Sequence, residues 1–499
     1  MVPSSIGRPE QSVIILTGVG PLHLYKTREM GIDAEVFKVL GSAMNKDTFS
    51  PRIPTIGAVT VATFAEKQQI HVQVRDFYAS DLNDCCADII GISSTFMGLQ
   101  HIKEIASFAR QKNPSSTIVL GGPISWSLSP SALFELIPEI DVIVMGEGEQ
   151  TFVELVKAVS ADGNLNRIKG LFLKQGHRYS FTGMRGPLSG DSIPTPQWKL
   201  LDVSFSQTVP FFPVETSRGC PYNCAYCSEV HYWGKPPRYR SLSAVLDEIK
   251  HNVDEFGIAT FRFTDSCFSA PPERAATICD AIYDRFVRNG IAIRWSSYAR
   301  IDNLTYNLLE KMKHSGCFAL DIGVESGAPS ILKKMGRNYS KEQIINVAKA
   351  ARELDMITDF NIVVGFPGET VETVEQTINM LQEAKPDAFS CFVLFVAPHM
   401  AISEYQARYG LRGSGLSWSH TTMTSEDAYK ALERISQSVT SSCSFPGAES
   451  FACYLAAIGY SSEQIRAFLK ATTQLARSGK DEKSRTIVEE ACRRLQDWW

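Results

Sequence analysis

The chain has 499 residues, of which 44% are hydrophobic, and a formal net charge of −4. This length allows two to four domains with sizeable cores, and the charge excludes the basic composition typical of proteins that bind nucleic acid or anionic membranes. Because we recognise no signal peptide and no apolar run of membrane-spanning length, the twelve irregularly spaced cysteines predict a reduced, cytoplasmic protein.

Strands and helices alternate over residues 10–160, and this alternation predicts an α/β domain with a parallel sheet and right-handed crossovers. The expected strands are 13–16, 71–75, 88–92, 117–120 and 141–145, and the expected helices are 56–67, 99–110 and 151–159. Ligands of such sheets bind beyond the carboxyl ends of the strands. We therefore expect a binding edge where these strands end.

The residues at these strand ends are small or polar: Ser93, Ser94, Thr95, Gly121, Gly122, Gly146 and Glu147. Glycines let a ligand approach the backbone closely, and hydroxyls can donate hydrogen bonds to it. The alternative is that these residues only form tight turns between strands and helices.

Residues 161–205 are dense in glycine and proline, which predicts a linker after a first domain at 1–160. One hairpin is expected within it, with strands at 171–174 and 179–181. An extended stretch at 192–196 is expected near its end.

Three cysteines lie in one short loop, Cys220, Cys224 and Cys227, at the spacing C-x3-C-x2-C. The loop follows an apolar run at 209–214 that predicts a buried strand. Three thiolates aimed at one point suit a [4Fe–4S] cluster whose fourth iron has no protein ligand. Such an open metal position can bind and activate a small molecule. The alternative is a tetrahedral zinc site completed by His231.

A second alternation of strands and helices follows the loop. The expected strands are 260–263, 291–297, 318–324, 357–364 and 388–396, and the expected helices are 243–256, 273–288, 304–314, 340–354 and 373–384. Ser340 and Gln343 form a capping box at the start of the fourth helix. Together with the strand before the cysteine loop, the pattern predicts a partial (β/α)6 barrel over 206–410, with its active site at the strand ends.

Polar residues gather at the ends of these strands: Asp265, Ser297, Arg300, Glu325, Ser326 and Glu369. Any one of them could be a helix N-cap. Several of them beside one cysteine loop instead predict a shared ligand, because carboxylates and guanidinium groups form charge-assisted hydrogen bonds.

The last part of the chain, residues 411–499, begins after a Gly-Ser-Gly boundary. Amphipathic stretches at 425–439, 461–476 and 483–499 predict a small helical domain, and Ser461 with Gln464 predicts a cap for the second helix. Its aromatic side chains are expected to form a core, and a lid over the barrel mouth is the alternative.

The cysteine loop and the barrel strand ends resemble those of radical S-adenosylmethionine (SAM) enzymes. The match rests on the segment from Cys220 to Cys227, which has an aromatic residue just before the third cysteine. The resemblance implies a [4Fe–4S] cluster, SAM bound at its free iron, and reductive cleavage of SAM to a 5′-deoxyadenosyl radical. It also implies SAM contacts from these residues: Tyr226, Asp265, Ser297, Glu325, Ser326 and Phe366.

The first domain resembles the Rossmann-like cobalamin-binding domain that precedes many radical SAM barrels. The resemblance implies that a corrin lies against the carboxyl edge of the sheet, held by these residues: Ser93, Thr95, Gly121, Gly122, Gly146 and Glu147. The Asp-x-His-x-x-Gly motif that supplies an axial histidine is missing, since His23 has no aspartate two residues before it and no glycine three after it. We expect cobalamin without a histidine ligand, or else a domain that has lost its corrin.

Together the resemblances imply a cobalamin-dependent radical SAM methyltransferase that acts on an unactivated carbon. The implied partners are a small-molecule or peptide substrate and a flavodoxin- or ferredoxin-like electron donor, without nucleic acid or membrane. The first alternative is a cyclase or oxidase on the same scaffold. A tRNA methylthiotransferase needs a second three-cysteine cluster, which Cys85 and Cys86 alone could not hold, and a corrin or metal sensor is the non-enzymatic alternative.

Overall fold

The computed structural model describes residues 12–17, 35–43, 55–78, 80–94, 99–176, 178–203, 210–404, 406–478 and 481–495. The chain forms two compact units, each described here by itself. The first unit comprises Met1–Gly20, Thr55–Leu188 and Ile193–Val203, and the second comprises Pro21–Pro54, Ser189–Ser192 and Ser204–Trp499. The chain thus begins in the first unit and passes into the second at residue 21. It returns to the first unit at residue 55 and lies in the second unit from residue 204 onward.

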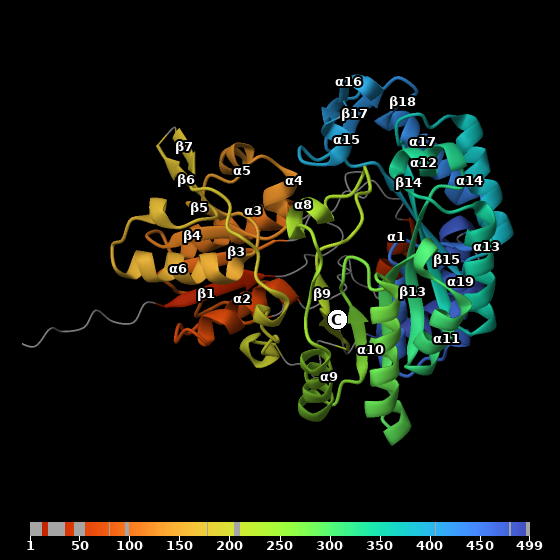
Figure 1. Cartoon of the computed structure of the whole chain (residues 1–499), viewed down its shortest axis with the longest axis horizontal. Helices are drawn as coiled ribbons and strands as arrows, with labels where there is room; N and C mark the ends of the chain where they lie inside the picture. The colour runs from red at the N-terminus through yellow and green to blue at the C-terminus, as the bar shows by residue number, and fades with distance from the viewer. Residues whose placement is uncertain are drawn as a thin grey trace, which may run out of the picture. The chain divides into compact units, whose positions relative to one another are not determined.

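The first unit is built on one seven-stranded sheet (Figure 1). Its strands are β1 (Val13–Thr17), β2 (Gln73–Asp76), β3 (Ile89–Ser93), β4 (Thr117–Gly121), β5 (Val142–Val144), β6 (Leu171–Gln175) and β7 (Arg178–Phe181). They stand in the order β2-β1-β3-β4-β5-β6-β7, parallel through β5 and antiparallel from β5 to β7. The five predicted parallel strands are confirmed, and the predicted hairpin extends the same sheet.

Helices cover both faces of this sheet, as a doubly wound fold requires. One face carries α3 (Leu99–Lys112), α4 (Ile124–Ser127) and α5 (Pro130–Leu136), whose apolar residues share a core with alternate residues of the strands. The other face carries α2 (Ile56–Glu66) and α6 (Gly148–Ser160), which pack on each other. Gly91 allows this packing, since a Cβ there would lie 3.3 Å from the ring of Phe152 in α6.

The second unit contains another seven-stranded sheet, and every neighbouring pair in it is parallel. Its strands are β8 (Phe212–Val214), β11 (Thr260–Phe263), β12 (Arg294–Arg300), β13 (Cys317–Glu325), β14 (Ile357–Val364), β15 (Ala388–Val393) and β19 (Cys443–Ser444). The order is β8-β11-β12-β13-β14-β15-β19. The six predicted strands of the partial barrel are confirmed, and β19 adds a short seventh strand at the edge.

Helices connect these strands in the predicted order. They are α9 (Leu242–Phe256), α10 (Pro272–Arg285), α11 (Tyr306–His314), α12 (Pro329–Met335), α13 (Lys341–Glu353) and α14 (Val371–Ala384). The capping box of Ser340 and Gln343 is present at the start of α13. Gly257 ends α9 in the left-handed conformation that favours glycine. The short helix α12 was not predicted.

The C-terminal helices pack on the barrel and share its core. The predicted helices are α17 (Ser425–Ser438), α19 (Ser462–Ser478) and α20 (Glu482–Leu495), and Ser461 and Gln464 make the expected cap. An additional helix that was not predicted, α18 (Ala448–Ala457), packs against strands β11 to β15. A further helix, α1 (Glu35–Ala43), packs on α19 and α20 although it lies near the start of the chain.

The boundaries of these units differ from the domain boundaries inferred from the sequence. The C-terminal helices belong to the same unit as the barrel, and the segment at 161–188 belongs to the first unit. Among the described residues, the helices are too short or too polar to cross a bilayer.

Candidate functional site

The cysteine loop begins directly after the short strand β9 (Ser217–Arg218), which pairs with β10 (Arg238–Tyr239). Gly219 makes the turn into the loop with φ +95°, and a Cβ at this position would lie 2.8 Å from the carbonyl oxygen of Gly234. Only glycine fits such a conformation and such a close backbone approach. The direction in which the loop leaves the strand is therefore fixed by backbone sterics.

The loop is also held at its middle. The amide of Ala225 donates to the carbonyl oxygen of Met335 at 3.2 Å, and its own carbonyl accepts from Ile402 at 2.9 Å. Two segments far apart in the sequence thus anchor the residue between the second and third cysteines. This anchoring restricts where the sulfurs can lie, as a preorganised metal site requires.

Two of the three cysteines are buried, and the third is half-buried. Burial raises the pKa of the Cys220 thiol, and the neighbouring Cys224 raises it further. Burial and Glu229 raise the pKa of Cys227, with smaller contributions from the other two cysteines. Ionised thiols in one loop repel one another, so a bound metal centre would be needed to keep all three deprotonated.

The donor set matches a [4Fe–4S] cluster, since three cysteines of one loop can supply three thiolates to a cubane. His231, the fourth ligand of the zinc alternative, lies in the helix α8 (Glu229–Trp233). Within the described part of the chain, no three histidine, cysteine or acidic side chains approach closely enough to bind a single metal ion.

Asp265, expected to contact SAM, lies at the end of β11 and is almost fully buried. Its carboxylate accepts from the amide of Thr216 at 3.0 Å, from the Thr216 hydroxyl at 2.7 Å and from the Ser217 hydroxyl at 2.5 Å. Asp265 thus supports the strand from which the cysteine loop departs. Its contact with SAM stays a prediction.

Glu325 and Tyr226, two further predicted SAM contacts, meet at Arg337. Glu325 forms an ion pair with Arg337 at 2.5 Å, and both are buried. The Tyr226 hydroxyl accepts from Nε of the same arginine at 3.0 Å. Glu325 has φ +67° at an irregularity in the pairing of β13 with β14. Backbone strain of this kind in a non-glycine residue is concentrated at functional sites.

The other predicted SAM residues are buried and in part engaged by the protein. The Ser326 hydroxyl accepts from the amide of Ala328 at 3.1 Å, and Phe366 is fully buried against Tyr409. The Ser297 hydroxyl is buried without a hydrogen-bond partner in the described residues. Glu369, which the sequence marks only as a polar strand end, accepts from the amide of Gly365, and burial raises its pKa to about 7.

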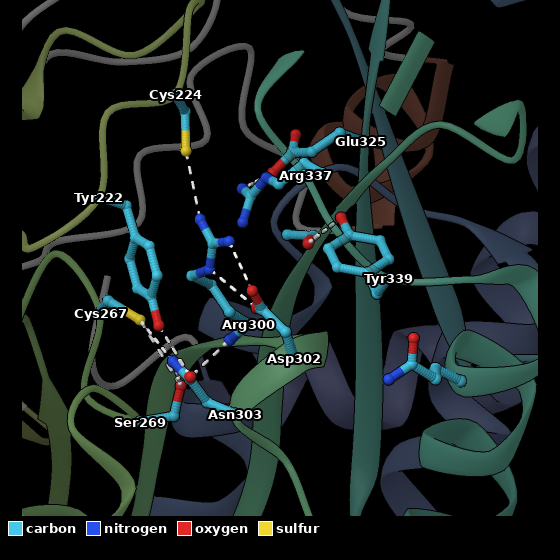
Figure 2. Close-up of polar contacts among 12 residues, drawn as sticks. Tyr222, Cys224, Cys267, Ser269, Arg300, Asp302, Asn303, Glu325, Arg337 and Tyr339 are labelled. Carbon is cyan, nitrogen blue, oxygen red and sulfur yellow. Dashed lines mark hydrogen bonds and ion pairs between the residues drawn. The ribbon is translucent and has the colours of Figure 1, made fainter. Parts of the chain in front are cut away.

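Arg300 contacts the sulfur of the second cysteine of the loop (Figure 2). Its Nη1 is 3.2 Å from Sγ of Cys224, and its Nε and Nη2 donate to the carboxylate of Asp302 at 2.9 and 2.8 Å. A fourth cysteine, Cys267, packs with Cys220 in a small buried cluster. The sequence marked Arg300 only as a polar strand end and gave no role to Cys267.

Sequence reasoning missed Arg337, Asp302 and Cys267. Arg337 follows the glycine that ends α12, and Asp302 lies in a turn, so neither stands in a recognisable motif. A buried ion pair could have been sought for Glu325 once a site was suspected, because a buried carboxylate needs a partner.

The predicted cobalamin residues of the first unit lie at one edge of its sheet. Ser93, Gly121 and Gly122, and Gly146 with Glu147 follow or end the neighbouring strands β3, β4 and β5. Among the described residues, a Cβ at Gly121 would meet nothing nearer than Val144 at 3.9 Å, so no described side chain crowds the backbone there. Thr95 and His23 lie outside the described residues.

Gly122 differs from its neighbour. It has φ +96°, and a Cβ there would lie 2.5 Å from the carbonyl oxygen of Ser94, whose hydroxyl donates to Gly121 at 2.7 Å. Gly122 therefore fixes the turn, whereas Gly121 leaves room for a ligand. The edge offers backbone and small side chains that fit a corrin.

Two family models match the chain. Residues 214–381 match the radical SAM superfamily, and residues 44–156 match the B12-binding domain. A protein of Pyrococcus horikoshii described as an uncharacterized methyltransferase is 31% identical over 364 residues, which is 70% of this chain and 78% of that protein. An anaerobic magnesium-protoporphyrin IX monomethyl ester cyclase of Cereibacter sphaeroides is 26% identical over 62% of this chain, which spans only 51% of the cyclase.

The fold is similar to that of the radical SAM methyltransferase TsrM from Kitasatospora setae, solved with cobalamin and a [4Fe–4S] cluster. The TM-score is 0.65 at 16% identity, over 94% of this chain and 99% of TsrM. A second structure of TsrM holds tryptophan as substrate and a SAM analogue, with a TM-score of 0.61 at 20% identity over 79% of this chain and 76% of TsrM.

Proposed function

The chain belongs to the cobalamin-dependent radical SAM methyltransferases, and we propose that it methylates an unactivated carbon of a small organic substrate. Its cofactors are a [4Fe–4S] cluster, SAM and cobalamin. The observation that carries the proposal is the cysteine loop beside the Glu325–Arg337 ion pair, in a chain that also has the glycine-lined edge of a B12-binding domain.

When bound, the cluster and SAM supply a radical that takes hydrogen from the substrate, and cobalamin supplies the methyl group. The residues of the chain hold and orient these groups. Cys220, Cys224 and Cys227 would hold the cluster through their thiolates. Glu325 and Arg337 offer a carboxylate and a guanidinium that match the hydroxyl and carboxylate groups of SAM.

The interior of the barrel supports a small substrate. Tyr298 of β12, Asn361 of β14 and Phe392 of β15 are half-buried, although most residues of these strands are buried. Tyr298 accepts a hydrogen bond from Arg262 at 2.7 Å, and Arg262 pairs at 2.9 Å with Glu449 of α18. Helix α18 thus closes one side of the barrel interior, and we infer that the partly accessible side chains face the substrate. The TsrM structure with bound tryptophan shows that a similar fold can hold a small organic substrate.

The electron needed to cleave SAM would come from a flavodoxin- or ferredoxin-like protein, as the family membership implies. Asp265 and Ser297 are proposed to contact SAM as well, and Gly121 and Gly146 to contact the corrin. These assignments rest on the position of each residue at the end of a strand.

Label transfer tests the proposal without knowledge of the substrate. The full chain is reconstituted anaerobically with iron, sulfide and hydroxocobalamin, reduced, and incubated with SAM labelled in its methyl group. We expect labelled methyl on the corrin together with S-adenosylhomocysteine. A protein without cobalamin is the matched control and should release neither product.

The alternative is a radical cyclase, to which the relative in Cereibacter sphaeroides corresponds. A cyclase would accumulate 5′-deoxyadenosine and an equal amount of methionine that carries the label, with no label on the corrin. That result would contradict the methyltransferase assignment and leave the cluster assignment intact. The methyltransferase is favoured because the more similar relative, matched over most of its length, is described as one.

A further inference from the structure

Arg300 is held by three different interactions around its guanidinium group, all inside the second unit (Figure 2). Its carboxylate partner, Asp302, accepts from Nε and Nη2 at 2.9 and 2.8 Å. Its central carbon lies 3.5 Å from the centre of the Tyr222 ring, a cation–π contact. Its remaining nitrogen, Nη1, lies 3.2 Å from Sγ of Cys224.

The arrangement leaves Arg300 little freedom. The planar fork is bound by Asp302 at two nitrogens, the ring of Tyr222 covers its face, and the residue is only 6% exposed. The hydroxyl of Tyr222 donates to Asn303 at 2.8 Å, so the ring itself is held in place. A guanidinium fixed in this way directs one N–H at the sulfur of Cys224 without further loss of conformational entropy.

A charged N–H that donates to a cluster thiolate withdraws electron density from the sulfur. The reduced cluster carries one more negative charge than the oxidised one, so the donor stabilises the reduced form more. Hydrogen bonds to the sulfurs and local charge are among the factors that set the reduction potential of iron–sulfur clusters. Asp302 offsets part of the positive charge and fixes its direction.

We propose that Arg300 is a positioning residue for the cluster: its hydrogen bond to the Cys224 sulfur raises the reduction potential of the cluster and so eases delivery of the electron that cleaves SAM. Asp302 and Tyr222 hold the guanidinium in place. The proposal rests on the cluster assignment and is independent of whether the methyl group goes to carbon, because its test uses neither substrate nor cobalamin.

A second arginine near the loop provides a matched control. Arg274 stacks on Tyr239 at 4.6 Å and donates to the carbonyl oxygens of Arg240 at 2.8 Å and Thr216 at 3.3 Å. It is half-buried like many residues of this region, but its described contacts are backbone oxygens and a ring. Removing its charge changes the local field without removing a hydrogen bond to a sulfur.

The test is a redox titration of the cluster followed by electron paramagnetic resonance, in the absence of SAM. The wild type is compared with Arg300→Gln, Arg300→Lys and Arg274→Gln, each reconstituted to the same iron and sulfide content. We expect Arg300→Gln to lower the ratio of reduced to oxidised cluster at a fixed potential about tenfold, which is about 59 mV for a one-electron couple. The reduction potential of Arg300→Lys should lie between those of the wild type and Arg300→Gln, because lysine keeps the positive charge but loses the fixed geometry of the guanidinium donors.

Each outcome decides the proposal. A full cluster with an unchanged potential in Arg300→Gln overturns it, and so does an equal shift in Arg274→Gln, which would indicate a general charge effect. If Arg300→Gln does not retain iron, Arg300→Lys is measured in its place, and an unchanged reduction potential in that variant likewise overturns the proposal. If the potential is unchanged and a separate equilibrium dialysis shows weaker SAM binding by Arg300→Gln, the proposal is overturned and Arg300 is assigned to the carboxylate of SAM.

Discussion

The barrel mouth and the edge of the first sheet both lie at the ends of parallel strands, yet they present different kinds of groups. At the barrel mouth, charged side chains pair with one another: Arg337 with Glu325 and Arg300 with Asp302. At the edge of the first sheet, glycine backbone and small hydroxyl residues predominate. At the barrel mouth, we expect ligand binding to be lost when one charged side chain is removed. At the edge of the first sheet, we expect it to be lost when a larger side chain is introduced.

The largest effect is expected at the cysteines. Replacing Cys220, Cys224 or Cys227 with serine should reduce iron from about four atoms per chain to well below one and abolish cleavage of SAM, because the cubane loses one of its three thiolates. Iron and sulfide analysis measures the loss. Cys267→Ser is the matched control, since this buried cysteine packs beside Cys220 and should leave the iron content unchanged. A loss of iron in Cys267→Ser alone would contradict the ligand assignment.

The next largest effect is expected at the ion pair of Glu325 and Arg337. Glu325→Gln should weaken SAM binding about 10- to 100-fold, because it removes a ligand for SAM and leaves the buried Arg337 without its charged partner. Equilibrium dialysis with the reconstituted protein measures the dissociation constant. Glu342→Gln, an exposed change in the first turn of α13, should leave it unchanged. Equal binding by the wild type and Glu325→Gln would remove Glu325 from the site.

At the glycine-lined edge of the first sheet, we expect a larger side chain to weaken ligand binding. Gly121→Val should lower cobalamin binding at least about tenfold with little loss of fold stability, since none of the described residues lies closer than 3.9 Å to a Cβ at this strand end. Gly122→Ala should instead lower stability, because its Cβ would meet the backbone of Ser94 at a positive φ. The absorption spectrum measures bound corrin, and thermal unfolding measures stability. Normal cobalamin binding by Gly121→Val would place the corrin elsewhere.

The last prediction concerns the stability of the charged barrel interior and not the binding of a ligand. Asp359 of β14 accepts from Ser390 at 3.1 Å and lies near Glu449, and burial raises its pKa to about 7. A carboxyl group with a raised pKa stabilises the fold below its unfolded pKa, and this contribution is lost as the pH rises to about 7. The free energy of unfolding of Asp359→Asn relative to the wild type should therefore increase by about 2 kcal/mol between pH 5 and pH 7.5. A pH-independent difference would show that Asp359 is already ionised at pH 5.

Most of the fold could be predicted because it follows from local patterns. The alternation of buried strands and amphipathic helices placed the parallel strands of both sheets, and the capping box at Ser340 marked the start of α13. The helix α18 was missed because most of its residues are buried, and a buried helix has no polar face to reveal its period. The short strand β19 has too few residues to show an alternation.

The site was predicted in part for the same reason. The cysteine loop and Glu325 stand in recognisable local patterns, and Gly121 ends an expected strand. Arg337 and Asp302 act through contacts that only the folded chain creates, so a single sequence contains no signal for them. Asp265 was assigned to SAM by its position, whereas the structure shows its carboxylate engaged by Thr216 and Ser217.

The helix α1 has a practical consequence. Val36 and Leu40 lie in the same apolar core as Phe451 and Leu469 of the last helices, although the first sheet separates them along the sequence. A shortened protein that starts at residue 204 would keep every cysteine of the loop. It would also expose the apolar side chains of the last helices that α1 covers. Such a fragment should therefore aggregate during purification, unless a peptide of residues 35–43 is added to cover these side chains.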